Sequence, residues 1–259
     1  MLEQKRLRLR HELKYSIDYF QYQLLRKKLA LVLKPDPHAG PDGSYHIRSL
    51  YFDDYKNTAL AEKTSGVSHR KKYRMRIYNC SDEYIKFERK TKRDHYVFKE
   101  SIRLTREEAE RIIAGDIAFL ADSENSLLKT FYLESRNTLL RPVVLVDYQR
   151  EAYVHPVGNV RITFDMRLQT ALGPVSFFDL NSCTMGVHED HDIILEIKFD
   201  DVLPLHIRGL FPNTIRPRSA IGKFAICRVT KNTPLNCSKN CPKNNTQHTK
   251  SERFDSKVS

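Results

Sequence analysis

The chain has 259 residues, five cysteines and no tryptophan, and its 44 Lys and Arg against 32 Asp and Glu give a net charge of +12. No uncharged apolar run reaches the roughly 18 residues that cross a bilayer, and residues 1–6 lack the apolar stretch of a secretory signal. The cysteines are scattered and odd in number, which indicates reduced thiols. We therefore expect a cytoplasmic protein, with peripheral membrane association left open.

The excess positive charge predicts an anionic partner, which could be nucleic acid, a membrane surface or a phosphate-rich small molecule. Residues 232–259 hold only five Lys and Arg against two acidic residues, so most of the excess belongs to the rest of the chain. Basic segments interleaved with aromatic residues, which bind single-stranded nucleic acid, are missing. We therefore do not expect a nucleic-acid partner.

The first predicted element is a strand from Leu7 to Tyr15, in which leucines alternate with charged residues such as Glu12 and Lys14. A helix follows, beginning at a capping box from Asp18 to Gln21 and continuing to residue 33. Residues 35–43 form a loop, and a second strand spans residues 45–54.

The most informative stretch runs from Arg70 to Lys99, where charged residues recur at every second position of two predicted strands. Lys72, Arg74 and Arg76 alternate with apolar residues in the first, and Lys86, Glu88 and Lys90 do so in the second. Antiparallel pairing across the turn at residues 79–82 sets five cations and one carboxylate on one surface. Like charges opposed across strands repel, so this surface needs either water or a bound polyanion.

The rest of the chain continues the pattern. Strands are predicted at residues 96–104, 141–153, 160–168 and 193–199, and helices at residues 105–115, 124–137 and 218–228. Residues 232–259 are polar with few apolar side chains, which predicts a disordered tail after a single domain of residues 1–231.

About eight strands with short helices indicate an α+β fold. If the charged faces pointed outward, the apolar faces would have to fill a barrel that the short helices could not share. If the charged faces instead point inward, they line an eight-stranded antiparallel barrel, or tunnel, with a polar basic interior, and the helices flank its outside. A solvated outer face is the alternative for any one strand.

An interior of this kind suits a chain of phosphates, because arginine grips phosphate oxygens in pairs and lysine supplies point charges. The predicted lining residues are Lys14, Arg74, Arg76, Lys86, Lys90, Lys99, Arg150, Arg161 and Lys198. Glu12, Glu88 and Glu196 would repel phosphate unless each pairs with a lysine or holds Mg²⁺ or Mn²⁺. For Glu88 a structural ion pair is an equal alternative, whereas Glu196 is favoured as a metal ligand.

Ten short motifs, in order, resemble the VTC domain, the polyphosphate polymerase module of the vacuolar transporter chaperone family. This family belongs to the triphosphate tunnel metalloenzyme, or CYTH-like, superfamily. The motifs lie between Arg10 and Arg228 and include Arg10-His-Glu-Leu-Lys-Tyr15, Ser49-Leu-Tyr-Phe-Asp53, Arg74-Met-Arg-Ile-Tyr78, Phe87-Glu-Arg-Lys-Thr91, Tyr148-Gln-Arg150, Leu195-Glu-Ile-Lys198 and Gly222-Lys-Phe224.

The resemblance implies transfer of the γ-phosphate of ATP to a growing inorganic polyphosphate chain, with Mn²⁺ or Mg²⁺. It places Lys14, Arg74, Arg76, Lys90, Lys99, Arg150, Arg161 and Lys223 at phosphate-binding positions, Glu196 at the metal-binding position and Tyr148 near the tunnel gate. We expect the catalytic cations to be Lys14, Arg74, Arg76, Lys90, Arg150, Arg161 and Lys223. The expected substrate-binding residues are Glu12, Lys86, Glu88, Lys99, Tyr148, Lys198 and Ser219.

The first strand departs from the superfamily pattern Glu-x-Glu-x-Lys, because here it reads Arg10-x-Glu12-x-Lys14. The missing carboxylate argues against a two-metal hydrolase. The SPX sensor and membrane helices of eukaryotic relatives are not in this sequence, so a separate membrane partner is expected as one option. An inorganic or nucleoside triphosphatase, and a non-catalytic polyphosphate-binding module, remain alternative functions.

Overall fold

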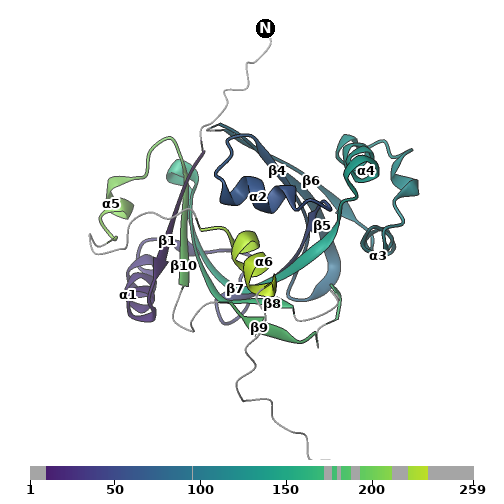
Figure 1. The fold of residues 1–259 in the computed structure, drawn as a ribbon. Helices are drawn as coiled ribbons and strands as arrows, with labels where there is room; N and C mark the ends of the chain where they lie inside the picture. Colours follow the sequence, from purple (N-terminus) through teal and green to yellow (C-terminus); the bar gives the residue numbers. More distant parts are fainter. Residues whose placement is uncertain are drawn as a thin grey trace, which may run out of the picture.

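The computed structural model describes residues 10–94, 96–171, 177–179, 182–187, 193–211 and 221–232 (Figure 1). The predicted tail after residue 232, the first residues of the predicted N-terminal strand and the start of the predicted last helix lie outside these ranges.

The strands form one antiparallel sheet that curls into a half-barrel (Figure 1). In spatial order its eight main strands are β1 (Arg10–Ile17), β10 (Ile193–Asp200), β8 (Val160–Ala171), β7 (Arg141–His155), β3 (Ser44–Asp53), β4 (Arg70–Tyr78), β5 (Ser81–Arg93) and β6 (Tyr96–Leu104). Two short strands were not predicted: β2 (Lys34–Pro35) pairs with β7, and β9 (Thr184–Gly186) pairs with β8. The predicted eight-stranded antiparallel fold with short helices is confirmed.

Strands β4 and β5 pair antiparallel, as predicted. Arg76 lies opposite Lys86, Arg74 opposite Glu88 and Lys72 opposite Lys90. The two turn residues, Asn79 and Cys80, both have positive φ (49° and 56°). A two-residue turn of this kind follows the right-handed twist of the strands it joins. The charged side chains of both strands therefore share one face.

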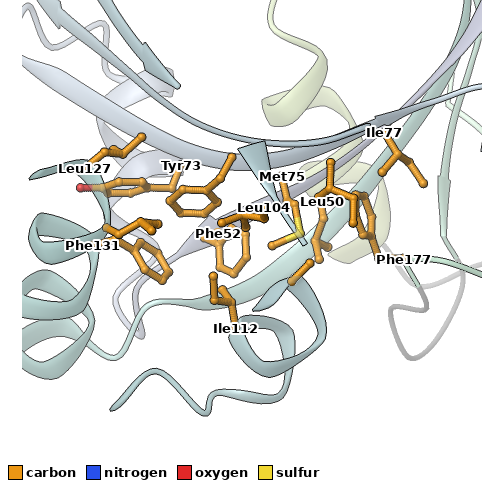
Figure 2. Close-up of a cluster of buried hydrophobic side chains, with 14 of the residues drawn as sticks. Leu50, Phe52, Tyr73, Met75, Ile77, Leu104, Ile112, Leu127, Phe131 and Phe177 are labelled. Carbon is orange, nitrogen blue, oxygen red and sulfur yellow. The ribbon is translucent and has the colours of Figure 1, made fainter. Parts of the chain in front are cut away.

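The apolar face of the hairpin is covered by helices α3 (Arg106–Ala114) and α4 (Ser126–Thr138). Figure 2 shows Tyr73, Met75 and Phe52 packed with Phe131 and neighbouring side chains in this cluster. Helix α3 begins at the predicted Thr105 capping box and ends at Gly115, whose φ is 85°. The apolar side chains of β4 and β5 therefore point outward into a helix-covered core, and the charged ones point to the opposite, inner face of the sheet.

Two further helices cover the outside of β1, β10 and β8. Helix α1 (Tyr19–Ala30) begins at the predicted capping box of Asp18 and Gln21, and α5 (Leu205–Arg208) follows β10. Tyr22, Leu25 and Leu29 of α1 and Ile207 of α5 are buried in one cluster with side chains of these strands. Helix α1 ends three residues before its predicted end, at Ala30.

Helices α2 (Thr58–Thr64) and α6 (Lys223–Asn232) lie on the concave side of the sheet, where Figure 1 shows them inside the curve. Phe224 and Cys227 of α6 are buried with Tyr51, Val146 and other inner-face side chains. The expected flanking helices thus cover the outside, and α2 and α6 lie within the curve as well. An apolar cluster around α6 fills part of the inner face, and the charged residues occupy the rest.

Candidate functional site

Arg74 and Arg76 lie on the inner face, as the alternation predicts. Arg76 is buried, and its guanidinium donates hydrogen bonds to Ser49 Oγ (3.1 Å) and Tyr148 Oη (3.3 Å). Ser49 belongs to β3 and Tyr148 to β7, so three strands converge on this arginine. Both of these partners are neutral hydroxyls, so neither of them neutralises the positive charge of Arg76.

Glu88 joins three of the predicted phosphate-binding cations. Arg74 Nε donates to Glu88 Oε2 at 2.5 Å, Lys99 Nζ lies 2.5 Å from Glu88 Oε1, and Lys86 Nζ lies 3.7 Å from the same oxygen. Glu88 is 1% exposed. Burial alone would raise the pKa of Glu88, but Arg74 and Arg76 outweigh it and lower the pKa to about 2. Glu88 is thus a buried counterion, the alternative that the sequence left open.

Asp165 on β8 is a second buried counterion, and the sequence analysis did not assign it a role. Arg150 donates to both of its carboxylate oxygens (2.6 and 2.8 Å), and Lys223 from α6 forms an ion pair with it. Burial opposes ionisation, yet Arg150 and Lys223 keep the pKa of Asp165 below its ordinary value. The available signal was its alternation with Arg161 and Thr163 on one face of the strand.

Glu196 and Glu12 form a third group, on the adjacent strands β10 and β1. Lys198 Nζ lies 2.5 Å from Glu196 Oε1, and Lys14 Nζ lies 3.0 Å from Glu12 Oε1. Burial would raise the pKa of Glu196, but Lys198 and Lys14 hold it well below the ordinary value. Lys90 from β5 reaches Glu12 Oε2 at 3.3 Å.

Arg161 lies toward one end of the sheet. Its guanidinium donates to Tyr45 Oη (2.9 Å) and forms an ion pair with the buried Asp36, which follows β2. A pocket of about 840 Å³ opens beside it, lined by Arg10, Lys34, His155 and Asn159 together with apolar side chains. Among the predicted site residues that the structure describes, Arg161 alone lines this pocket. The pocket is therefore at an end of the site and not at its centre.

Two aromatic hydroxyls lie among the cations. Arg74 donates to Tyr51 Oη at 3.3 Å. Burial would raise the pKa of Tyr51, but Arg74 and Arg76 lower it to about 8, and burial lowers the pKa of the nearby Lys72 to about 8. Tyr148, predicted near the gate, is buried with Arg150 and Lys223 over its ring. Sequence reasoning missed Tyr51 and Lys72 as members of the site.

The fit to a divalent cation depends on Glu12 and Glu196, which lie on the paired strands β1 and β10 and both interact with Lys14. No cluster of three or more His, Cys, Asp or Glu suited to a metal occurs in the portion of the chain that the structure describes. A pair of carboxylates nevertheless suits Mg²⁺ or Mn²⁺, which take one or two protein carboxylates and complete their shell with water and phosphate oxygens. Ser219 lies outside the described residues.

The VTC domain family matches residues 9–230. This chain belongs to the VTC domain family. The resemblance seen in the sequence is thereby confirmed over most of the chain. No curated protein sequence matches this VTC domain.

Solved structures with a similar fold share little sequence with the VTC domain described above. The Hippeastrum adenylyl cyclase HpAC1, described as having a dominant triphosphatase activity, aligns with a TM-score of 0.49 and 15% identity, over 87% of this chain and 98% of that chain. A Bacillus halodurans protein described as an adenylate cyclase gives 0.45 and 12% over 79% and 85%, and the Pyrococcus horikoshii protein PH1819 gives 0.43 and 11% over 84% and 97%. Family membership rests on the domain match and not on these structures.

The inner face of this VTC domain therefore holds more cations than carboxylates, and most of these cations form ion pairs. A bound phosphate chain can replace the carboxylates as partners of these cations, since charge-assisted hydrogen bonds to phosphate are equally strong.

No helix within the described ranges is both long and apolar enough to cross a membrane.

Proposed function

We propose that this VTC domain is a polyphosphate polymerase that transfers the γ-phosphate of ATP to a growing inorganic polyphosphate chain. The observation that supports it is the convergence of Arg74, Arg76 and Arg150 on one buried face of a curled sheet, with lysines on both sides. Residues 1–231 form the catalytic domain in this proposal, and residues 232–259 are a tail outside it. Its proposed partners are ATP and polyphosphate, and nucleic acid has no role. The proposed location is the cytoplasm.

The cations supply most of the catalysis in this mechanism. Phosphoryl transfer requires little covalent chemistry from the protein, because positioning and charge neutralisation dominate its barrier. The nucleophile is the terminal phosphate of the acceptor chain, so no protein base is needed. The proposed catalytic cations are Lys14, Arg74, Arg76, Lys90, Arg150, Arg161 and Lys223, and Lys86, Lys99, Lys198, Tyr148 and Ser219 are the proposed further substrate contacts.

The ion pairs of the free protein suggest how substrate binds. Glu88 and Asp165 hold Arg74, Arg150 and Lys223 oriented toward the inner face. Phosphate oxygens then compete with these carboxylates for the same donors. Arg76 bonds neutral hydroxyls in the free protein, so a phosphate binds it without displacing a carboxylate.

A divalent cation, Mn²⁺ or Mg²⁺, would be held by Glu196 with Glu12 and would neutralise charge on the phosphate oxygens. Lys198 and Lys14 keep Glu196 ionised, which is the state that binds a metal. Lys14 and Lys198 pair with these carboxylates, and with a divalent cation bound there both lysines would be available to phosphate.

The product formed from ATP tests the proposal. Incubation with ATP and Mn²⁺ is expected to release ADP and to build phosphate chains that a gel resolves by length. Orthophosphate as the sole product would identify a triphosphatase instead, and binding of polyphosphate without turnover would identify a non-catalytic module. Arg76→Ala is expected to abolish chain synthesis, while Arg111→Ala, which removes an arginine from the outer helix α3, is the matched control.

A further inference from the structure

The outward face of helix α1 carries large apolar side chains that no part of the described structure covers. Phe20 is 77% exposed, Leu31 is 87% exposed, and Leu24 between them is 39% exposed. At 100° per residue these three positions fall within a narrow arc of the helix. The packed side chains Tyr22 and Leu29 lie on the opposite side. The exposed arc is therefore not needed for the core.

Cations accompany this apolar arc. Lys27 and Lys28 lie in the last turn of α1, between Leu24 and Leu31, and the helix contains no acidic residue. At about 100° per residue, Lys27 lies about 20° from Phe20 on one side of the arc, and Lys28 lies about 40° from Leu24 on the other. The exposed face of α1 is thus both apolar and positively charged.

Helix α5 lies on the same flank of the sheet as α1, outside β1 and β10 (Figure 1), and both helices pack on the same buried cluster. Leu205 at the start of α5 is 80% exposed, and His206 and Arg208 follow it. We call the surface formed by Phe20, Leu24, Lys27, Lys28 and Leu31 the α1 flank.

We propose that the α1 flank docks on an anionic lipid surface, with α1 lying in the interfacial plane. A helix with bulky apolar side chains and lysines on one face partitions into the boundary between headgroups and acyl chains. Each lysine near the surface adds attraction to anionic lipid, and the net charge of +12 acts in the same direction. Pairing with a second copy of the chain is less favourable, because it would bring lysines of the two copies together.

Co-sedimentation with vesicles tests this inference independently of catalysis. The full chain is expected to sediment with vesicles of phosphatidylcholine and phosphatidylserine, and much less with phosphatidylcholine alone. Phe20→Ser combined with Leu31→Ser keeps every charge and is expected to weaken partitioning more than about tenfold, because each side chain loses its burial in lipid. Leu133→Ser, which removes an exposed leucine from α4 at the other end of the sheet, is the matched control and is expected to bind normally.

Three results would overturn the proposal. The first is failure of the unmodified chain to bind anionic vesicles. The second is equal loss of binding in Leu133→Ser and in the α1 variant, which would show unspecific adsorption or unfolding, and thermal unfolding distinguishes those two causes. The third is a concentration-dependent dimer in sedimentation velocity that the α1 variant abolishes, which would assign the α1 flank to a second copy of the chain. Polymerase activity enters none of these readouts.

Discussion

Lys90 Nζ lies 3.3 Å from Glu12 Oε2, although the two residues belong to strands near opposite ends of the sheet order. Lys90 is on β5, next to the edge strand β6, and Glu12 is on the edge strand β1. The contact therefore spans the open side of the half-barrel. It brings the cations of the β4–β5 hairpin to the same place as the carboxylates of β1 and β10.

The Glu12–Lys90 pair is expected to matter for binding more than for folding. Both side chains are partly exposed, and exposed pairs contribute at most about 1 kcal/mol to the free energy of unfolding. In metal-free buffer, Lys90→Gln should weaken tripolyphosphate binding, whereas Glu12→Gln should strengthen it by removing a repelling charge. Isothermal titration calorimetry measures both, and urea unfolding should show small changes. With Mn²⁺ present, Glu12→Gln should weaken binding instead.

Arg74→Ala and Arg76→Ala are expected to differ in stability although both weaken phosphate binding. Each should weaken the binding of tripolyphosphate by about 1–3 kcal/mol, because a charge-assisted hydrogen bond is lost. Arg74→Ala should also lower the free energy of unfolding, since it deprives the buried Glu88 of a partner. Arg76→Ala removes a partner only from two neutral hydroxyls, so its free energy of unfolding should stay closer to that of the unmodified protein. Unchanged affinity in both variants would contradict an inner-face phosphate site.

The period-two alternation of charge predicted much of this arrangement. It placed Arg74, Arg76 and Lys90 on one face of paired strands, because side-chain direction in a strand follows from the backbone alone. Capping boxes at Asp18 and Thr105 likewise located two helix starts, since their hydrogen bonds are local.

The contacts that sequence reasoning missed are long-range. Lys223 pairs with Asp165 only because α6 folds back onto the concave side of the sheet, and nothing near either residue encodes that path. Helix α2 also went unpredicted, because it is short and has no buried residue to give it an apolar period. Asp53, at the end of β3, accepts hydrogen bonds from the amides of Ala59 and Leu60, so the signal for α2 was a carboxylate outside the helix.

Glu88 should make the fold sensitive to acid. Its pKa of about 2 in the folded protein lies below the ordinary value of 4.5, so its ionised form contributes stability above pH 4.5 that is lost as the pH falls toward 2. The full effect is on the order of 3 kcal/mol, at about 1.4 kcal/mol for each pH unit of difference. Urea unfolding at pH 5, 4 and 3 should therefore show a smaller pH dependence for Glu88→Gln than for the unmodified chain. Equal slopes would mean that Glu88 is not the buried counterion.

Tyr51 and Lys72 should make phosphate binding sensitive to alkali. Both groups have a pKa of about 8, so raising the pH through 8 adds a negative charge at Tyr51 and removes a positive charge at Lys72. Both changes oppose a polyanion, and the affinity for tripolyphosphate should fall between about pH 7 and pH 9, where arginines stay charged. Tyr51→Phe should retain the Lys72 part of this fall and lose the rest. Tyr84→Phe, at an exposed position of β5, should behave like the unmodified protein, and an identical pH profile for Tyr51→Phe would remove Tyr51 from the site.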